Sequence, residues 1–287
     1  MSGERVTVYE VGPRDGLQNE PATLAAADKV RFVELLADAG LPAVEVTSFV
    51  SPAAIPKLAD ADTVLPAVRR RPGVRYPVLV PNLRGLARAT AAGAREIAVF
   101  AAASEGFSQA NIGRSISDSL DGYAAVVKQA QAAGMWVRGY VSTAFGCPYE
   151  GRVEPQAVVA VAAELRRMGC DEVSIGDTIG VAEPAQVAAL VPLVAARVAL
   201  DRIALHLHDT GGRALENVAA GLAAGVRVFD GSAAGLGGCP FAPGAPGNLA
   251  TEALVAFLER EGFSTGVDES LLAAAAAFVR ERLAAAA

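Results

Sequence analysis

The sequence repeats one pattern along its length: an alanine-rich helical segment, a glycine, and then a short run rich in β-branched residues. The pattern occurs at five glycines: Gly40, Gly93, Gly134, Gly169 and Gly225. Glycine just past a helix adopts the left-handed backbone conformation that closes the last turn, so each copy predicts a helix end followed by a strand. The chain is therefore expected to alternate helices with strands, an organisation typical of parallel sheets.

Eight strands are expected. They lie at residues 6–11, 43–46, 76–80, 96–100, 136–141, 172–175, 202–207 and 226–229. Helical periodicity fills the intervals, for example at 29–36 and at 117–133, where Ser115 and Asp118 form a capping-box pattern. Eight short alternations favour a (β/α)8 TIM barrel over a doubly wound sheet, and no Gly-x-Gly-x-x-Gly follows the first strand. An additional C-terminal helix is expected over 269–283.

Length and composition place the chain among globular proteins. Its residues are 52% hydrophobic and 20% charged, and TIM barrels commonly reach this length, so we expect one domain over residues 1–287. A net charge of −6 without a basic stripe disfavours nucleic-acid binding. No apolar run approaches the ~20 residues that span a bilayer, and a strand-like run begins almost at the N-terminus, so neither a membrane segment nor a targeting peptide is expected. Three cysteines, an odd number, fit reduced thiols in a cytoplasmic protein.

Both histidines of the chain lie in one strand-like segment, as His206-Leu207-His208. Residues two apart on a strand point to the same side, so the two imidazoles share one space. In a TIM barrel, active-site residues lie at the C-terminal ends of the strands. Asp15, which follows the first expected strand, adds a carboxylate at this end. Mixed oxygen and nitrogen ligands suit Mg²⁺, Mn²⁺ or another divalent ion. The alternatives are that Asp15 forms a turn before Gly16 and that one histidine is buried in the core and the other exposed.

Polar residues follow other strands too. Arg14 can face an oxyanion or form a salt bridge to Glu45. Glu45 and Asp177 can each serve as a base, as a partner of a metal ligand, or as a structural group at the barrel mouth. Cys239 lies in a glycine-rich loop after the eighth strand, which can close over a ligand, and its protonated thiol can donate to a carbanion. The alternative role, a small buried hydrophobe, fits Cys170 better than Cys239.

Six segments together resemble the 3-hydroxy-3-methylglutaryl-CoA lyase family, within the metal-dependent barrel lyases and Claisen synthases. They are residues 11–20 (Val-Gly-Pro-Arg-Asp-Gly-Leu-Gln-Asn-Glu), 47–52, 146–151, 176–180, 206–210 and 235–240. The resemblance runs from about Val6 to Val267, and Gly-Gly-Cys-Pro at 237–240 points to the lyase branch. Pro21 departs from the family pattern, because similar members have a lysine at this position. The difference affects the predicted contacts with the phosphates of CoA.

The resemblance implies a retro-Claisen lyase that cleaves 3-hydroxy-3-methylglutaryl-CoA to acetyl-CoA and acetoacetate, as in leucine degradation. It also implies a homodimer and a divalent cation, Mg²⁺ or Mn²⁺. The implied metal ligands are Asp15, His206, His208 and Asn248, and the implied catalytic residues are Arg14, Glu45, Asp177 and Cys239. The implied substrate-binding residues are Arg14, Gln18, Ser48, Asn111, Ser142 and Thr178.

In the expected mechanism, His206 or Asp177 takes the proton of the tertiary hydroxyl, and the sequence does not choose between these two bases. Arg14 stabilises the thioester enolate and Cys239 protonates it. One alternative is a lyase for a longer 3-hydroxy-3-alkylglutaryl-CoA, and another is a Claisen-type synthase that joins an acyl-CoA to a 2-oxo acid. A non-catalytic metal-binding scaffold is the alternative from a different class.

Overall fold

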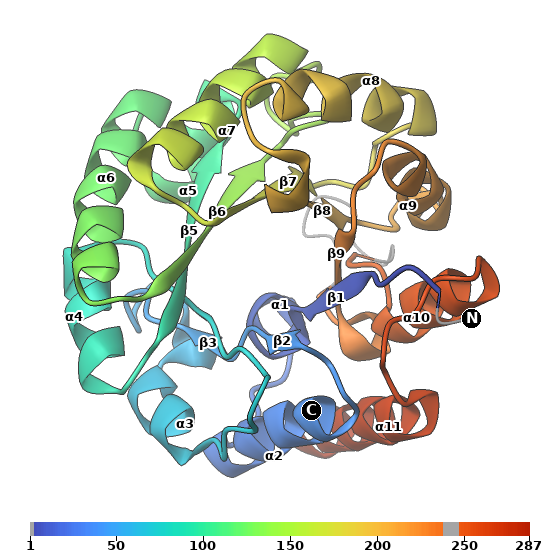
Figure 1. The fold of residues 1–287 in the computed structure, drawn as a ribbon. Coiled ribbons are helices and arrows are strands. Elements are labelled where there is room, and N and C mark those ends of the chain that lie inside the picture. Colours follow the sequence, from blue (N-terminus) through green and yellow to red (C-terminus); the bar gives the residue numbers. More distant parts are fainter. Residues whose placement is uncertain (1–2, 238–246) are drawn as a thin grey trace.

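The computed structural model describes residues 3–237 and 247–287, and a ring of parallel strands surrounded by helices forms its centre (Figure 1). The strands are β1 (Thr7–Glu10), β2 (Ala43–Val44), β3 (Thr47–Ser48), β4 (Val78–Leu79), β5 (Glu96–Ala102), β6 (Trp136–Ser142), β7 (Glu172–Asp177), β8 (Ile203–Leu207) and β9 (Val228–Gly231). Their order in the sheet is β2-β1-β9-β8-β7-β6-β5-β4-β3, with every pairing parallel. Strands that are successive in the chain are therefore neighbours in the ring, as in a TIM barrel.

The ring closes through β2 and β3, which are two halves of one interrupted strand. β2 pairs with β1, and β3 pairs with β4. Between them, the backbone N–H of Glu45 donates to the carbonyl of Glu10 at 2.8 Å, and that of Val46 donates to the carbonyl of Pro77 at 2.9 Å. The segment is thus bonded on both sides, and the predicted (β/α)8 barrel is confirmed.

The outer layer consists of helices that follow the strands around the ring. They are α1 (Leu17–Asn19), α2 (Ala26–Asp38), α3 (Ala61–Ala67), α4 (Leu83–Ala91), α5 (Glu105–Ile112), α6 (Ile116–Ala132), α7 (Pro155–Met168), α8 (Pro184–Ala195), α9 (Ala214–Ala223), α10 (Thr251–Arg260) and α11 (Glu269–Ala286). The expected C-terminal helix is confirmed as α11, which packs beside α2 with Arg282 Nε 3.6 Å from Asp28 Oδ1 (Figure 1). Among the helices of the described residues, none is both long and apolar enough to cross a membrane.

The glycines of the repeated pattern follow the ends of helices as expected. Their φ angles lie between 71° and 108° at Gly40, Gly93, Gly134, Gly169 and Gly225. These left-handed values are strained for residues that carry a Cβ atom. At the start of α6, Ser115 Oγ accepts a hydrogen bond from the backbone N–H of Asp118 at 3.0 Å, which confirms the predicted cap.

Alternation along the strands separates an apolar outer face from a barrel interior that mixes charged, aromatic and apolar side chains. In β6, Val137 belongs to the apolar core between strands and helices, whereas Arg138 is buried inside the ring. In β8, Leu205 packs in the same outer core, and His206 lies on the opposite face of the strand. Arg138 and His206 therefore lie inside the ring, with His206 near its C-terminal mouth.

Candidate active site

Three predicted metal ligands meet at the C-terminal end of the barrel. Asp15 lies in a π-helical turn, Gly12–Gly16, directly after β1, where its backbone N–H donates to the carbonyl of Val11 at 2.7 Å. His206 is in β8, and His208 follows the end of that strand. One ligand atom from each of Asp15, His206 and His208 lies within 4.8 Å of the others. Two strand ends thus bring one carboxylate and two imidazoles together.

Asn248 joins this group from the segment after β9. Its Nδ2 donates to Asp15 Oδ2 at 2.9 Å and to the carbonyl of Leu236 at 3.1 Å. An antiparallel bridge also pairs the backbone of Asn248 with that of His208. The fourth residue implied as a ligand by the family resemblance therefore lies beside the other three.

The polar atoms of this group fit a divalent cation. Nδ1 of His208 and Oδ1 of Asn248 are buried, and neither has a hydrogen-bond partner among the described residues. Burial, helped by the neighbouring His206, lowers the pKa of His208 to about 4, so its ring is neutral at pH 7 and free to ligate. Burial acts to raise the pKa of Asp15, but Arg14 and the two histidines outweigh it and leave that pKa below its ordinary value. An ionised carboxylate, neutral imidazole nitrogen and amide oxygen are suitable donors for such an ion.

Arg14 is buried beside the group, between two carboxylates. Its Nη1 lies 2.5 Å from Asp15 Oδ1, and its Nε lies 3.1 Å from Glu45 Oε1. Tyr140 donates a hydrogen bond to Glu45 Oε2 at 2.6 Å, and Cζ of Arg14 lies 5.5 Å from the centre of the Tyr140 ring. The salt bridge that the sequence offered for Arg14 is confirmed, and it holds the guanidinium next to the predicted metal ligands.

A second buried ion pair lies deeper in the barrel and was not predicted from the sequence. Arg138 is 0% exposed, and its Nη2 lies 2.6 Å from Asp230 Oδ1. The other oxygen of Asp230 lies 3.1 Å from His206 Nδ1, and Glu172 Oε1 lies 3.0 Å from Arg138 Nε. The sequence feature that could have revealed this pair is Arg138, a charged residue within a strand-like run. A charge is stable in a barrel interior only when it is paired, so an arginine there implies a nearby carboxylate.

Asp177, at the end of β7, is engaged by the loop that follows it. Its carboxylate accepts hydrogen bonds from the backbone N–H groups of Val181 and Ala182, both at 3.0 Å. Burial raises the pKa of Asp177 to about 6, although these hydrogen bonds act in the opposite direction. Asp177 therefore shapes this loop, and its use as a base stays a prediction.

The remaining predicted substrate-binding residues lie in different settings. Ser48 is buried in β3, whereas Asn111 is exposed on α5. Ser142 ends β6 half-buried, and Thr178 Oγ1 accepts a backbone hydrogen bond at 2.7 Å. Oε1 of Gln18 is buried and has no hydrogen-bond partner among residues 3–237 and 247–287. Their contacts with a substrate stay predictions.

Cys239 lies outside the described residues, so the structure does not place the predicted proton donor. Cys147 and Cys170 are buried free thiols. Burial raises the pKa of Cys170 to about 12, which agrees with its expected role as a small buried hydrophobe.

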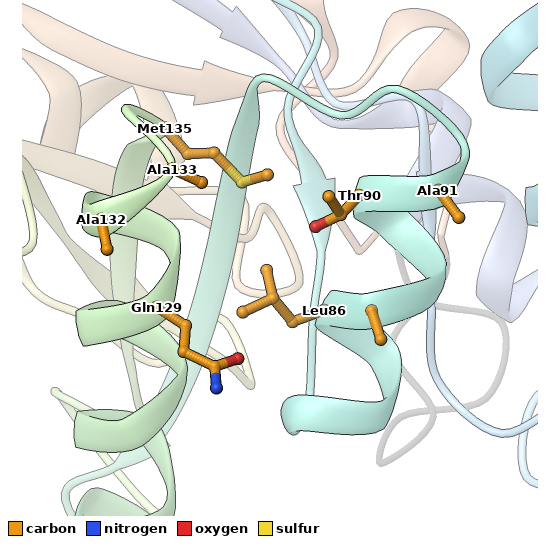
Figure 2. Close-up of a pocket in the computed structure, with 8 residues that line it drawn as sticks. Leu86, Thr90, Ala91, Gln129, Ala132, Ala133 and Met135 are labelled. Carbon is orange, nitrogen blue, oxygen red and sulfur yellow. The ribbon is translucent and has the colours of Figure 1, made fainter.

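A surface groove of about 650 Å³ lies between α4 and α6, away from these residues (Figure 2). Leu86 and Thr90 of α4 face Gln129 of α6 and Met135 across it. The groove adjoins the C-terminal ends of both helices, so it lies toward the N-terminal ends of the strands, opposite the ligand cluster. Its lining carries no ionisable side chain that could perform chemistry.

Fold and site together define a TIM-barrel protein with a candidate metal centre at the C-terminal mouth and an arginine beside it. The family described as HMGL-like matches residues 5–279, and the chain belongs to that family.

Named relatives match over nearly the whole chain. "Hydroxymethylglutaryl-CoA lyase, mitochondrial" from Bos taurus is 49% identical over 280 residues, which cover 98% of this chain and 86% of the relative. "3-hydroxy-3-isohexenylglutaryl-CoA/hydroxy-methylglutaryl-CoA lyase" from Pseudomonas aeruginosa is 51% identical over 265 residues, which cover 92% of this chain and 88% of the relative. A solved structure of an HMG-CoA lyase from Acinetobacter baumannii, in complex with coenzyme A and 3-methylmalate, has a TM-score of 0.93 and 37% identity, and the match covers 98% of this chain and 92% of that chain.

Proposed function

We propose that this protein is a carbon-carbon lyase that cleaves 3-hydroxy-3-methylglutaryl-CoA to acetyl-CoA and acetoacetate. The observation that carries the proposal is the convergence of Asp15, His206 and His208 beside Arg14 at the mouth of the barrel. The names of the relatives support the substrate, and the complex of one relative with coenzyme A supports a CoA thioester. We infer Mg²⁺ or Mn²⁺ as the cation, held by these three residues and Asn248.

Such an ion, when bound, orients a hydroxyl and a carboxylate and makes the hydroxyl easier to deprotonate. The proton of the substrate's tertiary hydroxyl passes to Asp177, because the lone pair of His206 Nε2 is used, in this proposal, to bind the cation. With a pKa of about 6, Asp177 is mostly ionised at pH 7 and retains useful basicity. His206 Nδ1 faces Asp230, so only its Nε2 points toward Asp15.

The carbon-carbon bond then breaks, and its electron pair moves into the enolate of the acetyl thioester. Arg14 would stabilise the enolate oxygen by on the order of 3 kcal/mol, because its guanidinium is already held in place by Glu45. Cys239 would donate the proton that completes acetyl-CoA, and acetoacetate leaves as the second product. We further propose that Glu45, Gln18, Ser48, Asn111, Ser142 and Thr178 line the substrate or position the residues that do.

We also propose that residues 1–287 form a single domain, that the protein acts as a homodimer, and that it is cytoplasmic. Acetoacetate as a product fits a role in leucine degradation.

A specific observation favours a second substrate. The Pseudomonas aeruginosa relative is named for both the methyl and the isohexenyl ester, and it is 51% identical to this chain. A lyase for a longer 3-hydroxy-3-alkylglutaryl-CoA is therefore the alternative function.

The deciding experiment measures acetyl-CoA release from a series of 3-hydroxy-3-alkylglutaryl-CoA esters, from methyl to isohexenyl. Each reaction is run with added Mg²⁺ or Mn²⁺ and again with excess chelator. The proposal expects metal-dependent turnover that is fastest on the methyl ester. A higher kcat/KM on the isohexenyl ester would favour the alternative, and no release from any ester would reject the lyase function.

A further inference from the structure

The imidazole of His206 has a carboxylate on each side. Its Nε2 lies 4.0 Å from Asp15 Oδ2, in the cluster of predicted ligands, and its Nδ1 lies 3.1 Å from Asp230 Oδ2. A carboxylate oxygen accepts hydrogen bonds, so in the neutral ring the proton belongs on Nδ1 and the lone pair on Nε2. The contact with Asp230 thus selects the tautomer that directs a ligating nitrogen toward Asp15.

Asp230 is itself fixed in place. It lies in β9, where its register partner in β8 is His206, and it is 2% exposed. Its Oδ1 lies 2.6 Å from Nη2 of Arg138, and Ser174 Oγ donates to its Oδ2 at 3.3 Å. Charge-assisted hydrogen bonds of this kind are short and strong, so the carboxylate has little freedom to turn away from the imidazole.

Arg138 is equally confined. Its guanidinium carbon lies 3.7 Å from the ring centre of Tyr9 and 4.9 Å from that of Tyr140, and its Nη1 donates to the hydroxyl of Tyr140 at 3.2 Å. Glu172 Oε1 lies 3.0 Å from its Nε. Two aromatic rings and two carboxylates therefore hold the arginine in one orientation within the barrel.

We propose that Asp230 is a positioning residue, which with Arg138 fixes the tautomer and orientation of His206 so that Nε2 is presented to a divalent cation. The inference rests on the proposed metal site and adds the residues that prepare one of its ligands. Partners of this kind commonly change metal affinity when they are removed.

The chain offers a matched control for a merely structural ion pair. Glu172 and Asp230 are both buried carboxylates within 3.0 Å of Arg138, but Asp230 is the one whose second oxygen lies against His206. In Asp230→Asn, Arg138 needs an acceptor, so the amide oxygen turns toward it and the amide NH2 faces His206. That donor favours the tautomer with the proton on Nε2, which opposes ligation.

The first experiment measures Mn²⁺ binding by electron paramagnetic resonance for the wild type, Asp230→Asn and Glu172→Gln. The proposal expects Asp230→Asn to bind about 10–100-fold more weakly and Glu172→Gln to stay within about twofold of the wild type. Equal affinity of Asp230→Asn and the wild type would overturn the proposal, as would equal losses in both variants. A wild type that binds no Mn²⁺ would instead reject the metal site itself.

The second experiment needs no bound metal, and its first result comes from the wild type alone. The chain has only two histidines, so ¹⁵N-histidine labelling of the full-length, untagged protein gives two imidazole spin systems. The spectrum is recorded on chelator-treated wild type at a pH at which both imidazole rings are neutral. Under this condition the proposal expects His206 to carry its proton on Nδ1. A proton on Nε2 of His206 would overturn the proposal even if Asp230→Asn failed to fold. Where that variant folds, its His206 tautomer should be reversed.

Discussion

Asn248 Nδ2 donates a hydrogen bond to Asp15 Oδ2 at 2.9 Å, although 233 positions separate the two residues in the chain. The contact joins the turn after the first strand to the segment after the last one, across the mouth of the barrel. His208 lies next to the same contact, because its backbone is bridged to that of Asn248. The candidate site therefore depends on closure of the ring, which makes the first and last strands neighbours.

Replacing Asp15 with asparagine should abolish most of the activity. Asp15→Asn preserves the size of the side chain but removes the negative charge among the proposed ligands. A bound metal contributes several kcal/mol to such reactions, so we expect turnover to fall by about 10³-fold. Steady-state kinetics and Mn²⁺ titration check this. Asp62→Asn, on an exposed aspartate that pairs with Arg88, is the control and should change neither value. Unchanged Mn²⁺ affinity in Asp15→Asn would contradict a ligand role.

Loss of the Arg14 cation should slow the chemical step more than substrate binding. Arg14→Met is expected to lower kcat by roughly 10²–10³-fold, the usual effect of removing one donor to a developing oxyanion. Arg88→Met is a close match, because Arg88 also pairs with an aspartate and lies 5.4 Å from the centre of an aromatic ring, Phe49, but on the outer surface. Comparable kcat values for Arg14→Met and the wild type would exclude enolate stabilisation by Arg14.

The proposed proton donor can be tested against a second cysteine of the chain. Cys239→Ala should reduce turnover by roughly 10²–10⁴-fold, the range for loss of a general acid. Cys170→Ala removes a buried thiol at the start of a strand and should lower thermal stability while leaving kcat within about twofold. Wild-type turnover in Cys239→Ala would show that another group protonates the enolate.

The pH dependence of stability should contain a contribution from Glu10. Its buried carboxylate accepts hydrogen bonds from the backbone N–H of Gly12 at 2.7 Å, from that of Ala233 at 2.9 Å and from the hydroxyl of Thr251 at 2.6 Å. Burial raises the pKa of Glu10 from 4.5 to about 7, although these hydrogen bonds act to lower it. Between those values the folded state binds more protons than the unfolded state, so this contribution is full below the unfolded pKa and is lost as pH rises through 7.

Glu10→Gln keeps the side chain neutral at every pH, with its amide oxygen able to accept from the two backbone donors. We therefore expect the free energy of unfolding of Glu10→Gln, taken relative to that of the wild type, to increase by on the order of 2 kcal/mol from pH 5 to pH 8. Urea unfolding at the two pH values measures the difference. If the difference in the free energy of unfolding between Glu10→Gln and the wild type were the same at pH 5 and pH 8, Glu10 would not titrate near neutral pH in the folded state.

Local signals explain why most of the fold could be predicted from the sequence. The glycines that end helices and the cap at Ser115 act within a few residues, so they are visible without knowing the fold. The meeting of Asp15 with the two histidines followed from one global rule, that strand ends converge at the mouth of a barrel. The split of the second strand into β2 and β3 was not predicted, because it depends on hydrogen bonds from both neighbouring strands.

The buried ion pairs could not be predicted in the same way. Arg138 and Asp230 lie 92 positions apart, and their contact depends on which side chains face each other across the ring interior. Tyr140 was missed for the same reason, since its partner Glu45 lies 95 positions away. A single sequence shows a charge in a strand but does not identify the residue that neutralises it.

The guanidinium of Arg138 gives the barrel a strong preference for assembling as a whole. One of its two carboxylates arrives with β7, but the other, Asp230, belongs to the final strand of the circle. A fragment ending before β9 would therefore bury the guanidinium of Arg138 with only one of its two carboxylates. The free-energy penalty of removing this charge from water would then be only partly offset. Stable partial barrels should therefore not accumulate from this sequence. Two fragments of the chain, divided between β7 and β9, should fold only when they associate with each other.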